Sequence, residues 1–155
     1  MLAFVESKNS APKGKKMSPT ARRLARRLAL QALYQWQMAG ASLATVEAEF
    51  REDNDMKVVD QEYFCELLHR IPAQLSQLDD LITPHLDRTL KELTPIELTI
   101  LRMGAYELAK RKDVPYKVVI NEGVNLTKAF GATDGHKYVN GILDKLAREL
   151  RSNEI

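Results

Sequence analysis

Residues 21–38 read ARRLARRLALQALYQWQM. Their aliphatic side chains recur every three or four positions, which is the spacing of one face of an α-helix and not of a β-strand. Ser18 can accept a hydrogen bond from the first turn, and Pro19 suits the first helical position because its missing N–H needs no partner there. The stretch therefore predicts an amphipathic helix that begins at Ser18-Pro19.

The same helical spacing continues to the end of the chain. Further helices are predicted over residues 43–53, 63–82, 95–112, 115–130 and 134–150. A short helix is expected to open at Thr83, and Pro72 is expected to kink or split the helix that contains it. No segment alternates like a strand. The predicted fold class is all-α, with about seven helices in two packed helical subdomains.

The clearest helix start is Thr94-Pro95-Ile96-Glu97. Thr94 is predicted to cap this helix and Glu97 to complete a capping box, in which each residue bonds the backbone N–H of the other. Gly131 is predicted to stop the following helix, and Thr133 or Asp134 to cap the last one. Local chemistry thus sets several boundaries without any tertiary information.

The 155 residues divide into three predicted parts. Residues 1–17 have almost no apolar periodicity and are predicted to form a disordered basic tail. The rest has a seam near Thr83, between an N-terminal subdomain over 18–82, which carries the arginine-rich helix, and a C-terminal subdomain over 83–155. The one cysteine excludes an internal disulfide, and no apolar run is long enough for a secretory signal or a membrane span. A soluble cytoplasmic protein is expected.

Charge is segregated along the chain. Between Glu6 and Glu47 lie eight of the 23 Lys and Arg residues and none of the 21 Asp and Glu residues. The net charge of +2 therefore hides a strongly basic head on a mildly acidic remainder. Such segregation indicates a polyanionic partner and makes nucleic acid the first hypothesis.

Four arginines, Arg22, Arg23, Arg26 and Arg27, lie opposite most of the aliphatic residues of the predicted first helix. At about 100° per residue they spread over one arc, so we expect them to face solvent. Tyr34 falls in the same arc two turns further on. A basic stripe that ends in an aromatic ring is typical of single-stranded RNA binding, because guanidinium groups meet phosphates and the ring stacks on a base.

Two alternatives stay open for this face. A charged helix face can serve solubility alone, but such faces usually interleave Glu with Arg, and this one has no acidic residue. Tyr34 can equally be a half-buried ring that covers a neighbouring helix. Trp36 is predicted to pack in the core.

A second candidate site lies at the start of the last predicted helix. Free N–H groups at a helix N-terminus favour phosphate, and Gly135 lets another backbone come close. Lys137 adds positive charge and Tyr138 adds an aromatic ring. The alternative is that the Asp134 carboxylate occupies those N–H groups as a cap and that Tyr138 belongs to the core.

The residues offer little chemistry for an enzyme. His69, His85 and His136 are scattered and no cysteine pair accompanies them, so no metal site is predicted. Cys65 lies in an apolar helical pattern and is interpreted as a small hydrophobic residue. Glycine-rich phosphate-binding motifs do not occur in the sequence. The chain is predicted not to be an enzyme and to need no cofactor.

Three long motifs resemble the NusB family of bacterial transcription antitermination factors. They are the opening stretch at 21–38, LRMGAYELAK at 101–110 and VPYKVVINEGVNLTKAFGATDGHKYVNGILDK at 114–145. The resemblance covers residues 19–151 and implies two helical bundles without catalysis. It also implies binding of boxA RNA as a heterodimer with NusE, a ribosomal protein of the small subunit. The pair is then expected to act in an RNA polymerase antitermination complex, notably on ribosomal RNA operons, while homodimerisation stays open.

The resemblance assigns roles within the arginine-rich helix. Arg22, Arg23 and Arg26 match the family's arginine-rich motif. Arg27 stands where relatives can carry an acidic residue, so its RNA role depends on the helix geometry alone. Leu24 stands where another arginine can occur, which makes the motif shifted rather than simply richer.

Four further positions carry implied roles. Tyr34, Asp134 and Tyr138 match positions tied to RNA binding in the family. Glu97 matches a position on the surface that meets NusE, which is compatible with its capping role. The competing hypothesis is a helical protein–protein adaptor that does not bind RNA directly.

Overall fold

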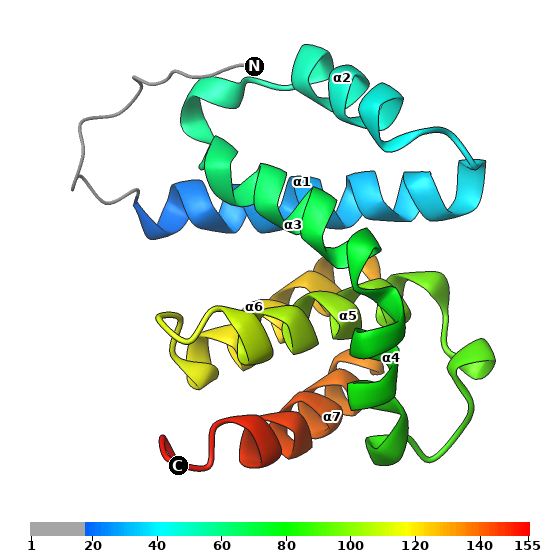
Figure 1. The fold of residues 1–155 in the computed structure, drawn as a ribbon, viewed down its shortest axis with the longest axis vertical. Coiled ribbons are helices and arrows are strands. Elements are labelled where there is room, and N and C mark those ends of the chain that lie inside the picture. Colours follow the sequence, from blue (N-terminus) through cyan, green and yellow to red (C-terminus); the bar gives the residue numbers. More distant parts are fainter. Residues whose placement is uncertain (1–17) are drawn as a thin grey trace.

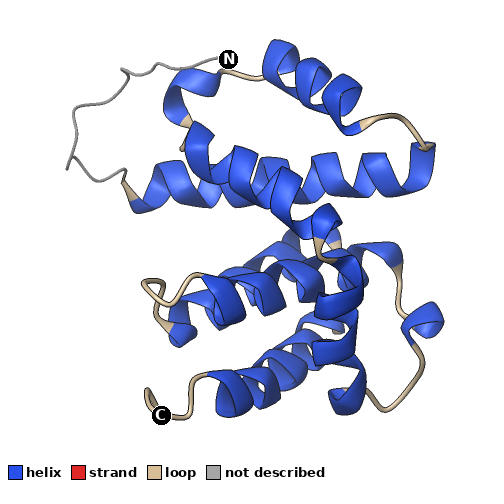
Figure 2. Cartoon of the chain, in the orientation of Figure 1, coloured by secondary structure: helices blue, strands red, loops and turns tan. Residues whose placement is uncertain are grey.

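The computed structural model describes residues 18–155, and the predicted basic tail over 1–17 lies outside the described residues. Seven α-helices and three short 3-10 helices follow one another (Figure 1). Between residues 18 and 155 there is no strand (Figure 2). None of the described helices is both long and apolar enough to cross a bilayer. The predicted all-α fold class is therefore confirmed.

Helix α1 (Pro19–Ala39) begins where its sequence predicts. The Ser18 hydroxyl accepts a hydrogen bond from the Ala21 N–H at 3.0 Å, and Pro19 occupies the first position. The helix ends at Gly40, whose φ of 72° is a left-handed conformation that residues with a Cβ rarely adopt. Helix α1 packs against α2 (Leu43–Asp53), α3 (Gln61–Ala73) and α5 (Pro95–Lys110), so more than one side of it is covered (Figure 1).

Helices α2 and α3 are joined by the short 3-10 helix η1 (Met56–Val58). Helix α2 buries only Val46, whereas α3 buries five large side chains, Tyr63, Phe64, Leu67, Leu68 and Ile71. The single helix predicted over residues 63–82 is divided at Gln74 into α3 and the next helix. Gln74 lies two residues after Pro72, which confirms the break expected at this proline.

Helix α4 (Leu75–Ile82) follows α3 in the chain but packs mainly against α5, with smaller contacts to α3 and α7 (Gly135–Leu150). Figure 1 shows α1, α2 and α3 stacked on a second group formed by α4 to α7. The 3-10 helices η2 (Thr83–His85) and η3 (Leu90–Glu92) complete the path to α5. The boundary near Thr83 stays a prediction, and the contacts of α4 place this helix with the second group.

Helix α5 lies at the centre and is buried almost all round. It starts with the predicted capping box: the Thr94 hydroxyl accepts from the Glu97 N–H at 3.1 Å, and the Glu97 carboxylate accepts from the Thr94 N–H at 3.4 Å. Gly104 of α5 lies so close to Leu143 of α7 that a Cβ there would be 2.5 Å from the leucine side chain. Small residues thus bring the helices of the second group into close contact.

The chain closes on α5 again at its end. Helix α6 (Tyr116–Phe130) stops at Gly131 as predicted, and α7 follows. The buried Arg151 then donates hydrogen bonds to three backbone carbonyls at the end of α5, those of Glu107, Leu108 and Arg111. Such bonds satisfy C-terminal carbonyls that have no partner within the helix.

Candidate nucleic-acid interface

The four arginines of α1 do not share one environment, and Arg26 differs most from the prediction. Arg26 is only 3% exposed, and its Nε and Nη2 donate to the Glu107 carboxylate of α5 at 3.0 and 2.9 Å. Burial alone would lower the pKa of Arg26, but Glu107 more than offsets it and the pKa lies above its ordinary value. Arg26 is therefore a buried ion-pair partner, and the expectation that it faces solvent is wrong.

The physical reason lies in the side of α1 that α5 covers. Leu30 and Leu33 follow Arg26 by four and seven residues, so they lie on the same helix face, and both are buried. The Tyr63 hydroxyl also donates to Glu107. The pKa of Tyr63 is raised, chiefly because the hydroxyl is buried and secondly because the Glu107 carboxylate disfavours a second negative charge beside it. The position of Leu30 and Leu33 is the sequence signal that would have placed Arg26 inside.

Arg22 and Arg23 each form an ion pair with a carboxylate, but part of each side chain remains exposed to solvent. Arg22 contacts Asp60 at 3.4 Å and stacks over the Tyr63 ring at 4.2 Å, with 31% of its side chain exposed. Arg23 contacts Glu122 of α6 at 3.2 Å, and 56% of its side chain is exposed. The arginine of each pair is open to solvent, whereas the Asp60 and Glu122 side chains are only 6% and 9% exposed, so a phosphate can reach the guanidinium groups but has to compete with a largely buried carboxylate.

Arg23 can also leave its partner without stranding a buried charge. The Glu122 carboxylate is 9% exposed, and its other oxygen lies 3.9 Å from Nη1 of Arg26. If the Arg23 guanidinium turns toward a ligand, Glu122 keeps a cationic neighbour. The counter-charges missing from the local sequence thus come from Asp60, which caps α3, and from α5 and α6, yet they do not hold Arg23 in place.

Arg27 is exposed and has no carboxylate within ion-pair distance among residues 18–155. Its guanidinium lies over the Phe130 ring at 4.9 Å. With Arg27, a row of exposed and half-buried side chains follows α1 at helical spacing: Arg23, Arg27, Gln31, Tyr34 and Met38. This row, called here the outer stripe, is cationic at its start and aromatic or apolar at its end.

A groove of about 670 Å³ runs beside the basic end of the outer stripe, between α1 and α6. Three polar side chains of α6 line it opposite the arginines, Asn121, Asn125 and Lys128. They lie on one face of α6 because they are four and three residues apart. These three residues were not predicted as site residues from the sequence. Their spacing of four and three residues on one helix face is the signal that could have identified them.

A second groove of about 640 Å³ lies beside the other end of the outer stripe. Tyr34 lines it together with Met38, Phe50, Ile96 and Phe130. Tyr34 is half-buried, so its ring is neither a core residue nor a free surface ring. Phe130 lines this groove, and its ring also lies under the Arg27 guanidinium. Phe130 therefore connects the aromatic end of the outer stripe to its cationic end.

The start of α7 differs from the predicted capping geometry. Asp134 stands at the N-cap position with a φ of 69°, but its side chain makes no cap hydrogen bond and is 72% exposed. Lys137 lies 3.8 Å from that carboxylate. The Asp134 carboxylate therefore does not occupy the first-turn N–H groups, and the prediction that it caps this helix with its side chain is wrong.

Gly135 does permit a close approach, but the group beside it is Glu97. A Cβ at Gly135 would be 2.7 Å from the Glu97 Oε2 atom, which shows how closely this carboxylate sits against the first turn of α7. Glu97 is only 8% exposed. The Glu97 carboxylate of α5 thus packs against the first turn of α7, and its predicted contact with a partner stays a prediction.

Tyr138 lies at the surface with one ring face covered. Its hydroxyl donates to Asp87 at 3.1 Å, and the Arg88 guanidinium stacks over the ring at 4.2 Å. Burial, followed by the hydrogen bond to Asp87, raises the pKa of Tyr138. The ring is half-buried and packs against the edge of the hydrophobic core, so the core alternative holds in part, and a base would have to share the ring with Arg88.

The fold and these surfaces define a small all-helical protein with a cationic, aromatic-ended face. Residues 23–148 match the model of the NusB family. The chain is 58% identical over 137 residues to the transcription antitermination protein NusB of Alcanivorax borkumensis, covering 88% of this chain and 91% of that protein. It is 57% identical over 145 residues to the protein of that name from Pseudomonas entomophila, covering 94% and 87%. The chain belongs to the NusB family, a regulatory rather than an enzymatic kind of protein.

Solved structures give the same assignment. The chain is similar to "T. maritima NusB, P3121, Form 2", with a TM-score of 0.71 and 31% identity, covering 86% of this chain and 94% of that one. It is also similar to a chain in a structure titled "Crystal Structure of a Plectonemic RNA Supercoil", with a TM-score of 0.73 and 26% identity, covering 82% and 94%. Both support the NusB-like arrangement of helices.

Proposed function

We propose that this protein binds boxA RNA of nascent transcripts together with NusE and thereby promotes antitermination, notably in ribosomal RNA operons. The names of its curated relatives support the antitermination role. The single observation that carries the RNA part is the outer stripe of α1. It offers exposed guanidinium groups at one end and an aromatic ring at the other. Single-stranded RNA needs both kinds of group, for its phosphates and for its unstacked bases.

In this proposal Arg23 and Arg27 neutralise phosphates, with Arg22 as a weaker contributor because it is held by Asp60 and Tyr63. Lys128 lies on the far wall of the adjoining groove and adds a third exposed cation. Asn121 and Asn125 provide amide donors and acceptors that can meet base edges or sugar hydroxyls. Arg26 makes no RNA contact and instead holds α1 on α5.

Tyr34 is proposed to stack on a base at the apolar end of the stripe, beside Phe130. The start of α7 is proposed as a second contact, in which Lys137 and the free face of Tyr138 meet the RNA. Asp134 and Gly135 shape the backbone there rather than bind phosphate by charge.

NusE is proposed to dock near the first turn of α5. Glu97 itself is buried, so we assign it to shaping that surface rather than to a direct salt bridge. Recruitment to the RNA polymerase antitermination complex follows from the same proposal. Self-association as a homodimer remains open.

One observation favours the alternative, a helical adaptor without direct RNA binding. Arg22 and Arg23 already have carboxylate partners within the protein. If those pairs persist, only Arg27 and Lys128 are left to meet phosphates, and the role of this face reduces to solubility or protein contact. The dependence of affinity on salt separates the two functions.

The test is a fluorescence-anisotropy titration of a boxA oligonucleotide, with and without NusE, at four salt concentrations. If three exposed cations, Arg23, Arg27 and Lys128, meet phosphates, log K should fall with log salt with a slope of about −2, since each single-strand phosphate contributes roughly 0.7. A scrambled oligonucleotide of equal length measures sequence preference. A flat salt dependence would support the adaptor.

The matched control is Arg148→Gln on α7. Arg148 is 65% exposed and pairs with Asp144 at 3.0 Å, much as Arg23 pairs with Glu122. Removing this charge tests whether any paired surface arginine supports binding. We expect Arg23→Gln to lower both the affinity and the salt slope, and Arg148→Gln to leave both unchanged.

A further inference from the structure

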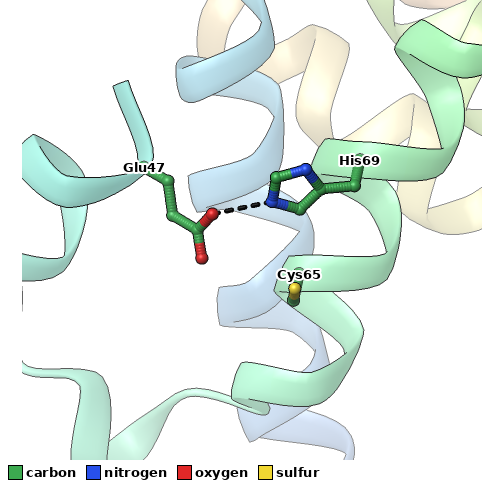
Figure 3. Close-up of side chains that lie close together, drawn as sticks. All are labelled: Glu47, Cys65 and His69. Carbon is green, nitrogen blue, oxygen red and sulfur yellow. Dashed lines mark hydrogen bonds and ion pairs between the residues drawn. The ribbon is translucent and has the colours of Figure 1, made fainter. Parts of the chain in front are cut away.

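Glu47 of α2 lies close to Cys65 and His69 of α3, and none of the three belongs to the outer stripe (Figure 3). Cys65 and His69 are four residues apart on α3, so their side chains leave the same face of that helix. Glu47 approaches them from α2. One ligand atom from each of the three residues lies within 4.8 Å of the other two. From this geometry we propose that the three side chains bind one Zn²⁺ ion.

The donor set selects the kind of metal. Thiolate sulfur, imidazole nitrogen and carboxylate oxygen are the three ligand types that zinc accepts in proteins. Magnesium and calcium require oxygen ligands, so a site with a thiolate and an imidazole disfavours both. Three protein ligands leave one position of the tetrahedron for water.

The side chains are close to the spacing that a tetrahedral ion needs. Zinc lies about 2.0–2.3 Å from its ligands, which places ligand atoms about 3.3–3.8 Å from one another. In the structure Glu47 Oε1 and His69 Nε2 share a hydrogen bond of 2.7 Å (Figure 3). This contact has to open by roughly 1 Å or less to admit the ion. The His69 side chain is 42% exposed, so it can move and leaves a path for the metal to enter.

Arg51 orients the carboxylate without using the proposed ligand atom. Its Nε donates to Glu47 Oε2 at 2.9 Å, whereas Oε1 faces His69. A ligating carboxylate usually keeps such an outer hydrogen bond, which fixes its orientation. With Cys65 as thiolate and Glu47 ionised, the ligand charges cancel those of the ion, and Arg51 remains paired.

Binding replaces protons and connects two helices. The Cys65 S–H bond breaks, a Zn–S bond forms, and the proton goes to the buffer. His69 gives up the Nε2 proton that it donates to Glu47; in the neutral ring this proton is replaced by one on Nδ1 through exchange with solvent, and the freed Nε2 lone pair coordinates the ion. Helix α2 buries only Val46 in the apo protein. An ion held by α2 and α3 together would therefore add the strongest cross-link that α2 has.

The experiment uses the full chain without a histidine tag, in its reduced form, and Zn²⁺ alone as the probe. Competition with a chromophoric chelator should give one ion per chain with a Kd of about 10 µM or tighter. Glu47→Gln, Cys65→Ser and His69→Gln should each weaken binding at least about tenfold, since even outer partners of a metal ligand cost 10–100-fold when removed. A Kd weaker than about 100 µM, or unchanged affinity in these variants, would overturn the proposal.

His85→Gln is the matched control. His85 Nε2 and Glu149 Oε1 also lie 2.7 Å apart, but this pair has no cysteine beside it. Its zinc affinity should equal that of the unchanged chain, and an equal loss there would show non-specific binding and reject the site. Co²⁺ supplies a readout that does not depend on variants. A thiolate-to-cobalt absorption band in the near ultraviolet supports Cys65 ligation, and its absence refutes it. Circular dichroism confirms that each variant is folded.

Discussion

Arginine side chains on the two sides of α1 have opposite environments: they are buried on the inner side, which faces α5, and exposed on the outer side, which faces solvent. Arg26 and Arg27 are neighbours in the chain, yet Arg26 is 3% exposed and tied to Glu107, whereas Arg27 is exposed and rests on Phe130. The difference arises because α5 covers one side of α1 and leaves the other open. This arginine-rich motif therefore contains both buried and solvent-exposed members, and the neighbouring helices decide which arginine is which.

The inner side has the larger energetic consequences. Removing one partner of a buried ion pair leaves an uncompensated charge, whereas an exposed pair contributes little. Tyr63 also bonds Glu107, so the inner side is a small network joining α1, α3 and α5. We therefore expect inner substitutions to change stability and outer substitutions to change RNA affinity.

The largest effect is expected for Arg26→Ala. It should lower the free energy of unfolding by about 3–5 kcal/mol, because Glu107 is left buried without its cation. Urea denaturation measures this, and Arg148→Gln controls for loss of a surface arginine. The double variant Arg26→Met with Glu107→Leu should recover much of the loss, since both members of the Arg26–Glu107 pair are removed together and Glu122 keeps Arg23 as its partner. A fully stable Arg26→Ala protein with weakened RNA binding would contradict the inner assignment.

Glu97→Lys tests the junction of α5 and α7. It removes the capping box and places a cation against the first turn of α7, where the helix dipole disfavours it. The unfolding free energy should fall by about 2 kcal/mol, more than the roughly 1 kcal/mol of a lost cap. Glu97→Gln keeps the cap and serves as control. If Glu97→Gln weakens NusE binding in calorimetry with its melting temperature unchanged, the carboxylate contacts NusE directly.

Tyr34→Ala examines the aromatic end of the outer stripe. The loss of a stacking ring should cost about 1–3 kcal/mol of RNA affinity. Tyr34→Phe keeps the ring and should bind normally, so anisotropy titrations of the two variants separate stacking from hydrogen bonding. Lowered melting temperature with intact RNA affinity would instead assign Tyr34 to packing.

Arg23→Gln combined with Arg27→Gln examines the cationic end. RNA affinity should fall about tenfold, or about 1.4 kcal/mol, and the salt slope should shrink by about 1.4 for two lost phosphate contacts. The unfolding free energy should change by no more than about 0.5 kcal/mol, as is usual for surface substitutions. An unchanged salt slope would remove these arginines from the interface.

Tyr138→Ala is expected to have the smallest effect. Arg88 covers one face of the ring, so the loss of RNA affinity should be about 1 kcal/mol or less, below that of a fully free stacking ring. Tyr138→Phe retains the ring and serves as control. A loss equal to that of Tyr34→Ala would show that Arg88 leaves the ring when RNA binds.

The sequence alone determined the features that depend on local chemistry. The all-α class, the starts at Ser18-Pro19 and Thr94-Pro95, the break after Pro72 and the stop at Gly131 follow from spacing, caps and backbone limits within a few residues. The family motifs could be recognised from the sequence for a related reason, because each is a continuous stretch of residues.

Only the tertiary structure decided which charged groups stay free and which groups from distant segments meet. Glu107 and Glu122 are far from α1 in sequence, so no local pattern could reveal that they neutralise Arg26 and contact Arg23. Cys65 and His69 show their helical spacing in the sequence, but Glu47 joins them only because α2 lies against α3. Helical periodicity specifies where a side chain points around its own axis, whereas burial and partnership depend on which other helices occupy that direction.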